Sequence, residues 1–178
     1  MAAAFDYLEQ AGKVRHFGVS NQNPMMMELL KTAVKQPLKV NQLQLSAAFT
    51  PSFEAGFHVN MEGPKAAVRD GSVFEYCRLT DTVIQAWSVL QHGYFKGNFV
   101  GKEEFVALNQ VLNDLAKKYQ VTPTAIALAW VLRYPGKMQA VIGTTKLQHV
   151  LEAGKAVTVT LTRKEWYQIY LAAGNDLP

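Results

Sequence analysis

Residues 122–153 read TPTAIALAWVLRYPGKMQAVIGTTKLQHVLEA, and this stretch decides the fold. It opens with a Thr-Pro helix start and an Ala- and Leu-rich helix that is apolar on all sides, and a Pro-Gly pair ends that helix. A strand over Met138 to Ile142, a turn at Gly143–Thr145 and a second helix through about Ala153 follow. A buried helix, a strand and a covering helix in this order predict one unit of a parallel α/β sheet.

The rest of the chain repeats this pattern. A helix over residues 1–11 comes first, and three further strands each precede at least one helix. The expected strands are Val14 to Ser20, Val40 to Ser46 and Val83 to Leu90. The expected helices run from Asn23 to near Pro37, from Ser72 to about Leu79, through the apolar positions of 105–119, and onward from Thr162. Strict alternation predicts a parallel sheet that is covered by helices, with right-handed crossovers.

Local signals refine these helices. Ser72 with Glu75, and Thr162 with Glu165, have the spacing of a capping box. The stretch from Ala47 to Pro64 has neither a helical nor a strand period, so we expect a long excursion there. In the helix that Asn23 caps, the predicted inner stripe is formed by Met26, Leu29, Leu30 and Ala33.

Composition excludes several classes of protein. A chain of 178 residues with 49% hydrophobic residues and a formal charge of +4 fits a folded α/β domain, which we expect to span residues 1–178. No run of five or more like charges occurs, which argues against nucleic-acid binding. The longest apolar run, Ala125 to Leu132, is far shorter than the ~18 residues of a membrane span, so we expect no membrane helix and no signal peptide.

Cysteine and histidine usage gives two further expectations. Cys77 is the one cysteine of the chain, so no internal disulfide forms, and we expect a reducing, cytoplasmic location. Its apolar helix segment favours a core residue over a nucleophile. The histidines lack the spacing of metal ligands on a helix, so no metal site is expected.

Active groups in parallel α/β folds gather at the carboxyl ends of the strands. The polar residues expected there are Ser20, Asn21 and the amide of Gln42. Trp87 and Ser88 follow the third strand, and the turn Gly143–Lys146 follows the fourth. This arrangement predicts a ligand site at one edge of the sheet.

Five segments are now recognisable: GKVRHFGVSN (12–21), VNQLQLS (40–46), IQAWSVLQHG (84–93), TPTAIALAWVLRYPG (122–136) and VIGTTKLQHVLEA (141–153). Together they resemble the aldo-keto reductase superfamily, and most closely a bacterial oxidoreductase branch. The resemblance implies a (β/α)8 TIM-type barrel that transfers a hydride between NADP(H) and a carbonyl or alcohol. The four units here resemble the fifth to the eighth, so we expect the C-terminal half of such a barrel.

The resemblance also assigns residues at the nicotinamide end of the cofactor. Ser20, Asn21 and Gln42 match the family residues that hold the nicotinamide carboxamide, and Trp87 matches the aromatic residue that stacks on the ring. The alternative is that the two amides satisfy loop backbone and that the indole belongs to the core. The loop beside the pyrophosphate is matched by Ser88, Leu90 and Gly93.

The fourth unit matches the adenosine end. Gly143, Thr144, Thr145 and Lys146 precede a helix, where backbone N–H groups and a cation favour the 2′-phosphate of NADP. His149 stands where many family members have an arginine, and a neutral imidazole offers a single donor in place of a fixed fork. That departure leaves NADP versus NAD open. Glu152 matches a residue that contacts the adenine.

The catalytic Asp, Tyr, Lys and His of the family match no segment here, and none of the seven tyrosines has the required context. Two hypotheses therefore stand. The chain is the cofactor half of an NADP(H)-dependent oxidoreductase that acts on a small carbonyl substrate when completed, or it is a non-catalytic dinucleotide-binding module. In both cases a half-barrel leaves unpaired sheet edges, so we expect self-association.

Overall fold

The computed structural model describes residues 1–53, 72–93 and 96–176. Within them, four strands pair side by side in chain order and all run parallel, which confirms the predicted sheet. The predicted first strand begins later, at Phe17, and the third ends earlier, at Trp87. The strands are β1 (Phe17–Ser20), β2 (Leu38–Gln44), β3 (Val83–Trp87) and β4 (Met138–Ala140).

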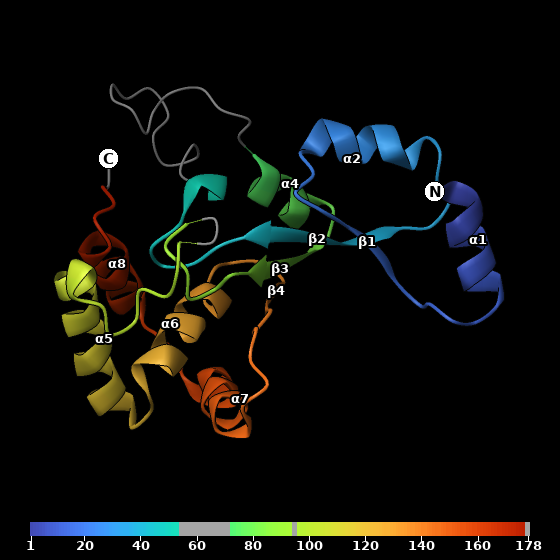
Figure 1. Cartoon of the computed structure of the whole chain (residues 1–178). Coiled ribbons are helices and arrows are strands. Elements are labelled where there is room, and N and C mark those ends of the chain that lie inside the picture. Colours follow the sequence, from blue (N-terminus) through green and yellow to red (C-terminus); the bar gives the residue numbers. More distant parts are fainter. Residues whose placement is uncertain (54–71, 94–95, 177–178) are drawn as a thin grey trace.

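Helices follow the strands in the predicted order. Figure 1 shows α1 and α2 at the β1 end of the molecule, and α5 and α8 at the opposite end. The helices are α1 (Ala2–Gln10), α2 (Pro24–Lys31), α4 (Val73–Leu79), α5 (Val106–Tyr119), α6 (Pro123–Leu132), α7 (Leu147–Gly154) and α8 (Arg163–Ala172). Two short 3-10 turns, η2 (Glu103–Phe105) and η3 (Lys155–Thr158), precede α5 and follow α7.

Helix α6 forms the centre of the core, as its apolar sequence predicts. All side chains from Ala125 to Val131 are buried. It is joined to α8 by two tryptophans: the indole Nε1 of Trp130 donates to the carbonyl of Trp166 at 3.0 Å, and Trp166 donates to the carbonyl of Trp130 at 3.0 Å. Their rings stack at 4.8 Å between centroids. This pairing satisfies both buried N–H groups and fixes the two helices against each other.

Side-chain caps begin several of the helices where the sequence predicts them. The Asn23 amide oxygen accepts from the backbone N–H of Met26 at 2.8 Å, and the Thr122 hydroxyl accepts from that of Ala125 at 3.2 Å. The capping box of Thr162 and Glu165 is confirmed. The box predicted for Ser72 is wrong, because its backbone is left-handed with a φ of +63°, and its side chain forms no cap hydrogen bond.

The predicted inner face of α2 is correct only at Leu30, which packs against a small buried cluster, and is wrong at Met26, Leu29 and Ala33. Met27 is fully buried, whereas Met26 is 47% exposed and Leu29 is 72% exposed. Met27 packs in a small cluster with Val34 and Leu38. Three consecutive methionines offer two apolar stripes of similar quality, and the position of the sheet selects the stripe that contains Met27.

The two faces of the sheet differ. Side chains on one face, such as Asn41, Leu43 and Ile84, are buried beneath helices, while the middle of the other face, at Val40, Gln42 and Gln85, is only partly buried. On that open face three opposed glutamines form a ladder. The Gln42 amide donates to Gln85 at 3.4 Å, and Gln85 donates to Gln139 at 2.9 Å. Each amide thus finds a partner within the ladder instead of on a helix.

The segments between β2 and β3 also contribute to the core. Cys77 on α4 is fully buried, which agrees with the core role predicted for it, and burial raises the pKa of its thiol. Phe53, in the first part of the predicted excursion, is buried against Phe74 and Tyr134 with centroid distances of 5.5 and 5.4 Å. The later part of that excursion, 54–64, lies outside the described residues.

One carboxylate anchors α5 to α8. Glu165 accepts from Lys118 at 2.6 Å, from Tyr119 at 2.8 Å, and from the backbone and hydroxyl of Thr162 at 2.8 and 2.7 Å. Burial raises the pKa of Glu165, but these hydrogen bonds outweigh burial and lower the pKa to about 2. The ionised carboxylate is therefore part of the packing between the two helices.

The Glu165 network makes stability depend on pH. The folded pKa of about 2 lies below the ordinary 4.5, so the stabilisation is complete above pH 4.5 and is lost as the pH falls from 4.5 toward 2. We expect Glu165→Gln to lower the free energy of unfolding at pH 7 by about 1–2 kcal/mol and to show a smaller loss of stability in acid. Urea unfolding at several pH values measures this. Glu104→Gln, at an exposed position, is the control, and an equal acid dependence in wild type and Glu165→Gln would contradict the assignment.

The burial of the side chains on α2 predicts which methionine contributes more to the free energy of unfolding. Met27→Ala removes a fully buried side chain and should cost about 2–5 kcal/mol of unfolding free energy. Met26→Ala, one residue earlier, should cost less than about 1 kcal/mol because its side chain is half exposed. Thermal or urea unfolding of both variants tests the orientation of the helix, and equal losses would show that it is rotated.

Candidate functional site

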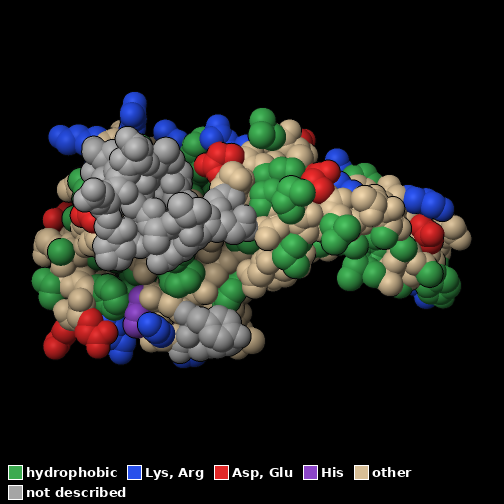
Figure 2. Space-filling view, turned by 90° about the horizontal axis from the view of Figure 1, so that it is seen from above, with side chains coloured by type: hydrophobic (Ala, Val, Ile, Leu, Met, Phe, Trp, Pro, Cys, Tyr) green, Lys and Arg blue, Asp and Glu red, His purple; other side chains and the backbone are tan. Residues whose placement is uncertain are grey.

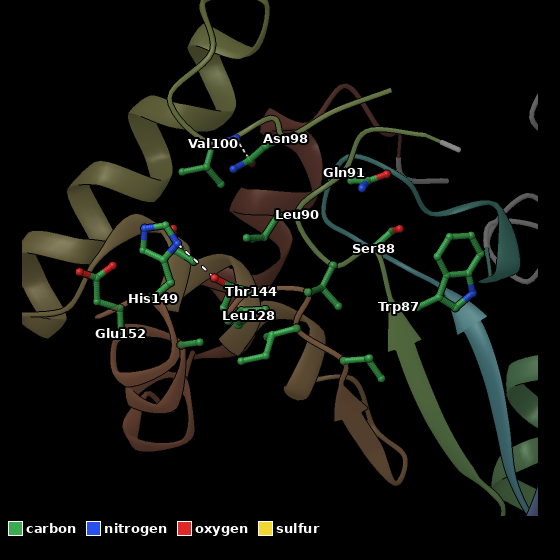
Figure 3. Close-up of a pocket in the computed structure, with 16 residues that line it drawn as sticks. Trp87, Ser88, Leu90, Gln91, Asn98, Val100, Leu128, Thr144, His149 and Glu152 are labelled. Atoms are coloured by element: carbon green, nitrogen blue, oxygen red, sulfur yellow. Dashed lines mark hydrogen bonds between the residues drawn. The ribbon is translucent and has the colours of Figure 1, made fainter. Parts of the chain in front are cut away.

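A hollow of about 650 Å³ opens at the carboxyl ends of β3 and β4. Its walls come from the loop after β3, from α6, from the turn after β4 and from α7 (Figure 3). Because parallel strands end at one edge of the sheet, residues far apart in sequence meet there. The hollow contains seven of the residues predicted from the sequence: Trp87, Ser88, Leu90, Gly143, Thr144, His149 and Glu152.

The polar end of the hollow lies at the start of α7. Thr144 Oγ1 lies 3.4 Å from His149 Nδ1 and accepts from the backbone N–H of Lys146 at 3.2 Å. The Glu152 carboxylate accepts from Gln148 at 2.7 Å. These contacts place a hydroxyl and an imidazole beside a helix N-terminus, where backbone N–H groups favour an anion.

The opposite end of the hollow is aromatic. Trp87, the last residue of β3, lines this hollow and also a neighbouring one of about 440 Å³ that includes Asn21 and Gln44. The two hollows therefore meet at the indole. The Nε2 atom of Gln44 is buried there without a hydrogen-bond partner in the described part of the chain.

The residues that end β1 lie close to β2. The Asn21 backbone N–H donates to the carbonyl of Gln42 at 2.9 Å, and the Ser20 hydroxyl donates to the same carbonyl at 3.2 Å. Asn21 has a φ of +52°, which turns the chain sharply at the strand end. Of the three, only Asn21 lines a hollow at this edge, because the Gln42 side chain bonds to Gln85 and Ser20 faces the groove between α1 and α2.

Three further predicted residues lie outside the main hollow. Thr145 and Lys146 are exposed beside it, and no ion pair of Lys146 occurs among the described residues. Gly93 is buried in the loop after β3, where an added Cβ would lie 2.8 Å from the side chain of Lys96. The cofactor-binding roles of these three residues therefore stay predictions.

The sequence reasoning missed several apolar residues of the hollow, including Val100, Leu128 and Ile142. Asn98 joins them because the loop after β3 folds back, with a bridge between Gln91 and Asn98. A hydrophobic residue carries no local sign that it lines a ligand site and not the core. The folded-back loop brings Asn98 and Val100 to the strand ends, whereas Leu128 comes from α6 and Ile142 from the turn after β4.

A tyrosine and lysine pair exists away from the hollow. Lys31 Nζ donates to the Tyr76 hydroxyl at 2.6 Å and to Glu28 at 2.8 Å. This contact joins α2 to α4 in the outer helical layer, and neither residue lines the hollow. No tyrosine that the structure describes lines the hollow either.

In residues 1–53, 72–93 and 96–176, no group of three His, Cys, Asp or Glu side chains is placed to hold a metal ion. No helix in the same ranges is both long enough and apolar enough for a bilayer span.

A parallel sheet of four strands with covering helices and a hollow at the strand ends is the architecture of part of a β/α-barrel protein. Comparison with known proteins makes this specific. The model of the Aldo/keto reductase family matches residues 1–171. The chain is 33% identical over 176 residues to the 6-dehydroglucose reductase of Agrobacterium fabrum, covering 98% of this chain and 52% of that protein. It is 32% identical over 180 residues to oxidoreductase YdhF of Escherichia coli, covering 100% of this chain and 54% of that protein.

Solved structures agree on the fold. The thermostable aldo-keto reductase Tm1743 has a TM-score of 0.68 at 20% identity, with 96% of this chain and 53% of that chain covered. An aldo-keto reductase from Klebsiella pneumoniae in complex with NADPH has a TM-score of 0.67 at 20% identity, with 94% and 51% covered. This chain belongs to the aldo/keto reductase family, whose members use NADP(H). It spans about half the length of the curated relatives that it matches.

Proposed function

We propose that this chain binds NADP(H) in the hollow at the ends of β3 and β4 and forms the cofactor-holding part of an oxidoreductase. The reaction is hydride transfer between the nicotinamide and a small carbonyl or alcohol. The observation that carries the proposal is the single hollow that joins Trp87 to the turn at Thr144 and to His149. A volume of about 650 Å³ falls in the usual range of cofactor sites.

The start of α7 suits the adenosine 2′-phosphate. Thr144 supplies a hydroxyl and Lys146 a cation, and the backbone N–H groups of the first turn of the helix point toward an anion. Lys146 has no competing carboxylate among the described residues, so its charge is available. Glu152, which Gln148 holds in place, lies one turn further along and suits the amino group of adenine.

The opposite end of the hollow suits the nicotinamide. The indole of Trp87 offers a flat apolar face, and Asn21 and Gln44 bring amides to the adjoining hollow. The unpartnered Nε2 of Gln44 is a donor for a ligand carbonyl. When bound, NADPH supplies the hydride, while the residues of this chain orient the ring and keep water from one face.

The proton donor is outside this set of residues. A carbonyl that accepts hydride also needs a proton at its oxygen, from a group held within ~3 Å. The tyrosine and lysine pair at Tyr76 and Lys31 is in the outer layer and cannot reach the hollow. We therefore propose that the chain alone binds the dinucleotide without turnover, and that the family's Asp, Tyr, Lys and His are needed for activity.

Cofactor binding gives the first test. Titration of the purified chain with NADPH, followed by nucleotide fluorescence, should saturate. Lys146→Ala should weaken NADPH binding about tenfold, the loss of one charge-assisted hydrogen bond, and leave NADH binding nearly unchanged. Lys155→Ala, at the far end of the same helix, is the matched control. Absence of NADPH binding at millimolar concentration would defeat the site assignment.

A substitution of His149, at the adenosine end, is expected to strengthen NADPH binding instead of weakening it. His149→Arg adds a fixed fork of donors beside Thr144, so NADPH should bind about tenfold more tightly than to the wild type. NADH lacks the 2′-phosphate and should not respond. Equal gains for both nucleotides would show that the arginine acts through general charge and that the phosphate lies elsewhere.

Turnover gives the third test. The chain is incubated with NADPH and a panel of aldehydes that includes 6-dehydroglucose, because one relative is named for that substrate. We expect no oxidation of NADPH above the rate without protein. Aldehyde-dependent oxidation that is proportional to the protein and survives purification would show that the chain is catalytically complete.

A further inference from the structure

We propose that a hollow between α4, the end of α6 and the start of α8 is a binding site for a small aromatic carboxylate. The hollow has a volume of about 310 Å³, near the lower end of the range of small-molecule sites. Among the described residues it shares none with the cofactor hollow. The proposal therefore does not depend on cofactor binding.

The hollow lies at the edge of the sheet where the strands begin. Arg78 is near the end of α4, shortly before β3, and Tyr134 and Pro135 lie between α6 and β4. The cofactor hollow opens at the opposite edge, where β3 and β4 end. No described lining residue comes from the outer strands β1 and β4 or from the helix that follows either of them. The hollow is therefore built by the middle of the described sheet and its helices.

Three of the five arginines of the chain line this hollow, namely Arg78, Arg133 and Arg163. In the part of the chain that the structure describes, none of the three forms an ion pair. The one carboxylate among the described lining residues is that of Glu75. Arg163 is also the first residue of α8, where the helix dipole favours negative charge. The excess of positive charge in the hollow favours an anionic ligand.

Contacts within the protein hold two of these guanidinium groups in place. Arg133 Nε donates to the carbonyl of Leu161 at 3.0 Å, so the N–H groups of its two terminal nitrogens remain for a ligand. The guanidinium carbon of Arg163 lies 5.8 Å from the ring centroid of Tyr167, one turn further along α8. Arginines that are already positioned lose less side-chain entropy when they bind a carboxylate.

The wall of the hollow is aromatic and largely buried. Trp166 is 8% exposed and Tyr134 is 9% exposed, and both belong to the hydrophobic core. The ring of Tyr134 packs edge-on against Phe74 with 4.9 Å between centroids. Burial raises the pKa of Tyr134 to about 12, so its hydroxyl keeps the proton at neutral pH and can donate to a carboxylate. Flat apolar walls beside guanidinium groups suit a flat apolar body that carries an acid group.

A small organic acid fits this hollow better than a polyanion such as a nucleic acid. Figure 2 shows Lys and Arg side chains at separate places on one face of the molecule, with Asp and Glu side chains beside several of them. A polyanion needs cations along an extended surface, whereas the hollow offers three at one point. The planar fork of an arginine matches the two oxygens of a carboxylate.

Isothermal titration calorimetry of the full chain with 2-naphthoate tests the proposal, and we expect saturable binding. 2-Naphthamide has the same rings without the charge, so it should bind at least about tenfold more weakly. Acetate has the charge without the rings, and it should also bind at least about tenfold more weakly. Saturating NADPH should leave the affinity for 2-naphthoate unchanged, because the acid and the nucleotide occupy different hollows.

Arginine variants locate the binding site. Arg133→Gln should weaken the binding of 2-naphthoate about tenfold, and Arg163→Gln should weaken it in the same way. Arg15→Gln makes the same change at an exposed arginine outside the hollow and should bind like the wild type. All three positions are exposed, so circular dichroism should show an unchanged fold.

Several results would overturn the proposal. One is the absence of 2-naphthoate binding at millimolar concentration, and another is equally tight binding of 2-naphthamide or acetate. Displacement of 2-naphthoate by NADPH would place the acid in the cofactor hollow. Unchanged binding in Arg133→Gln, or an equal loss in Arg15→Gln, would show that the arginines of this hollow do not hold the acid.

Discussion

The parallel register of four neighbouring strands is the constraint on which the rest depends. Parallel pairing requires a crossover after each strand, and the crossovers carry helices to one face of the sheet. It also makes all strands end at one edge. Trp87 and the turn at Gly143, which are distant in sequence, meet in one hollow for that reason. A slip in one register would separate the aromatic end of the hollow from its anion-favouring end.

Most of the fold could be predicted from local signals. The Thr-Pro start of α6 and the capping box at Thr162 depend only on neighbouring residues, and both predictions are confirmed. The errors arise where a tertiary contact decides. The box at Ser72 fails because the chain enters α4 with a left-handed residue, and the inner face of α2 is set by the sheet beneath Met27.

The site could be predicted in part. Residues that carry polar groups after the strand ends, such as Ser88 and Thr144, do line the hollow. Leu128 and Val100 could not be found, because an apolar side chain has the same local pattern in a core and in a ligand pocket. Gln42 shows the opposite difficulty. The sequence places its amide among the polar groups expected near the ligand, but in the structure this amide donates to Gln85 in the glutamine ladder.

The buried thiol of Cys77 has a practical consequence. It is the one sulfhydryl of the chain, it is fully covered by the core, and burial raises its pKa, so alkylating reagents meet it only when α4 lifts from the sheet. The labelling rate of the native protein therefore reports the frequency of that local opening. The chain carries its own probe of how firmly α4 is held against the sheet, without any engineered label.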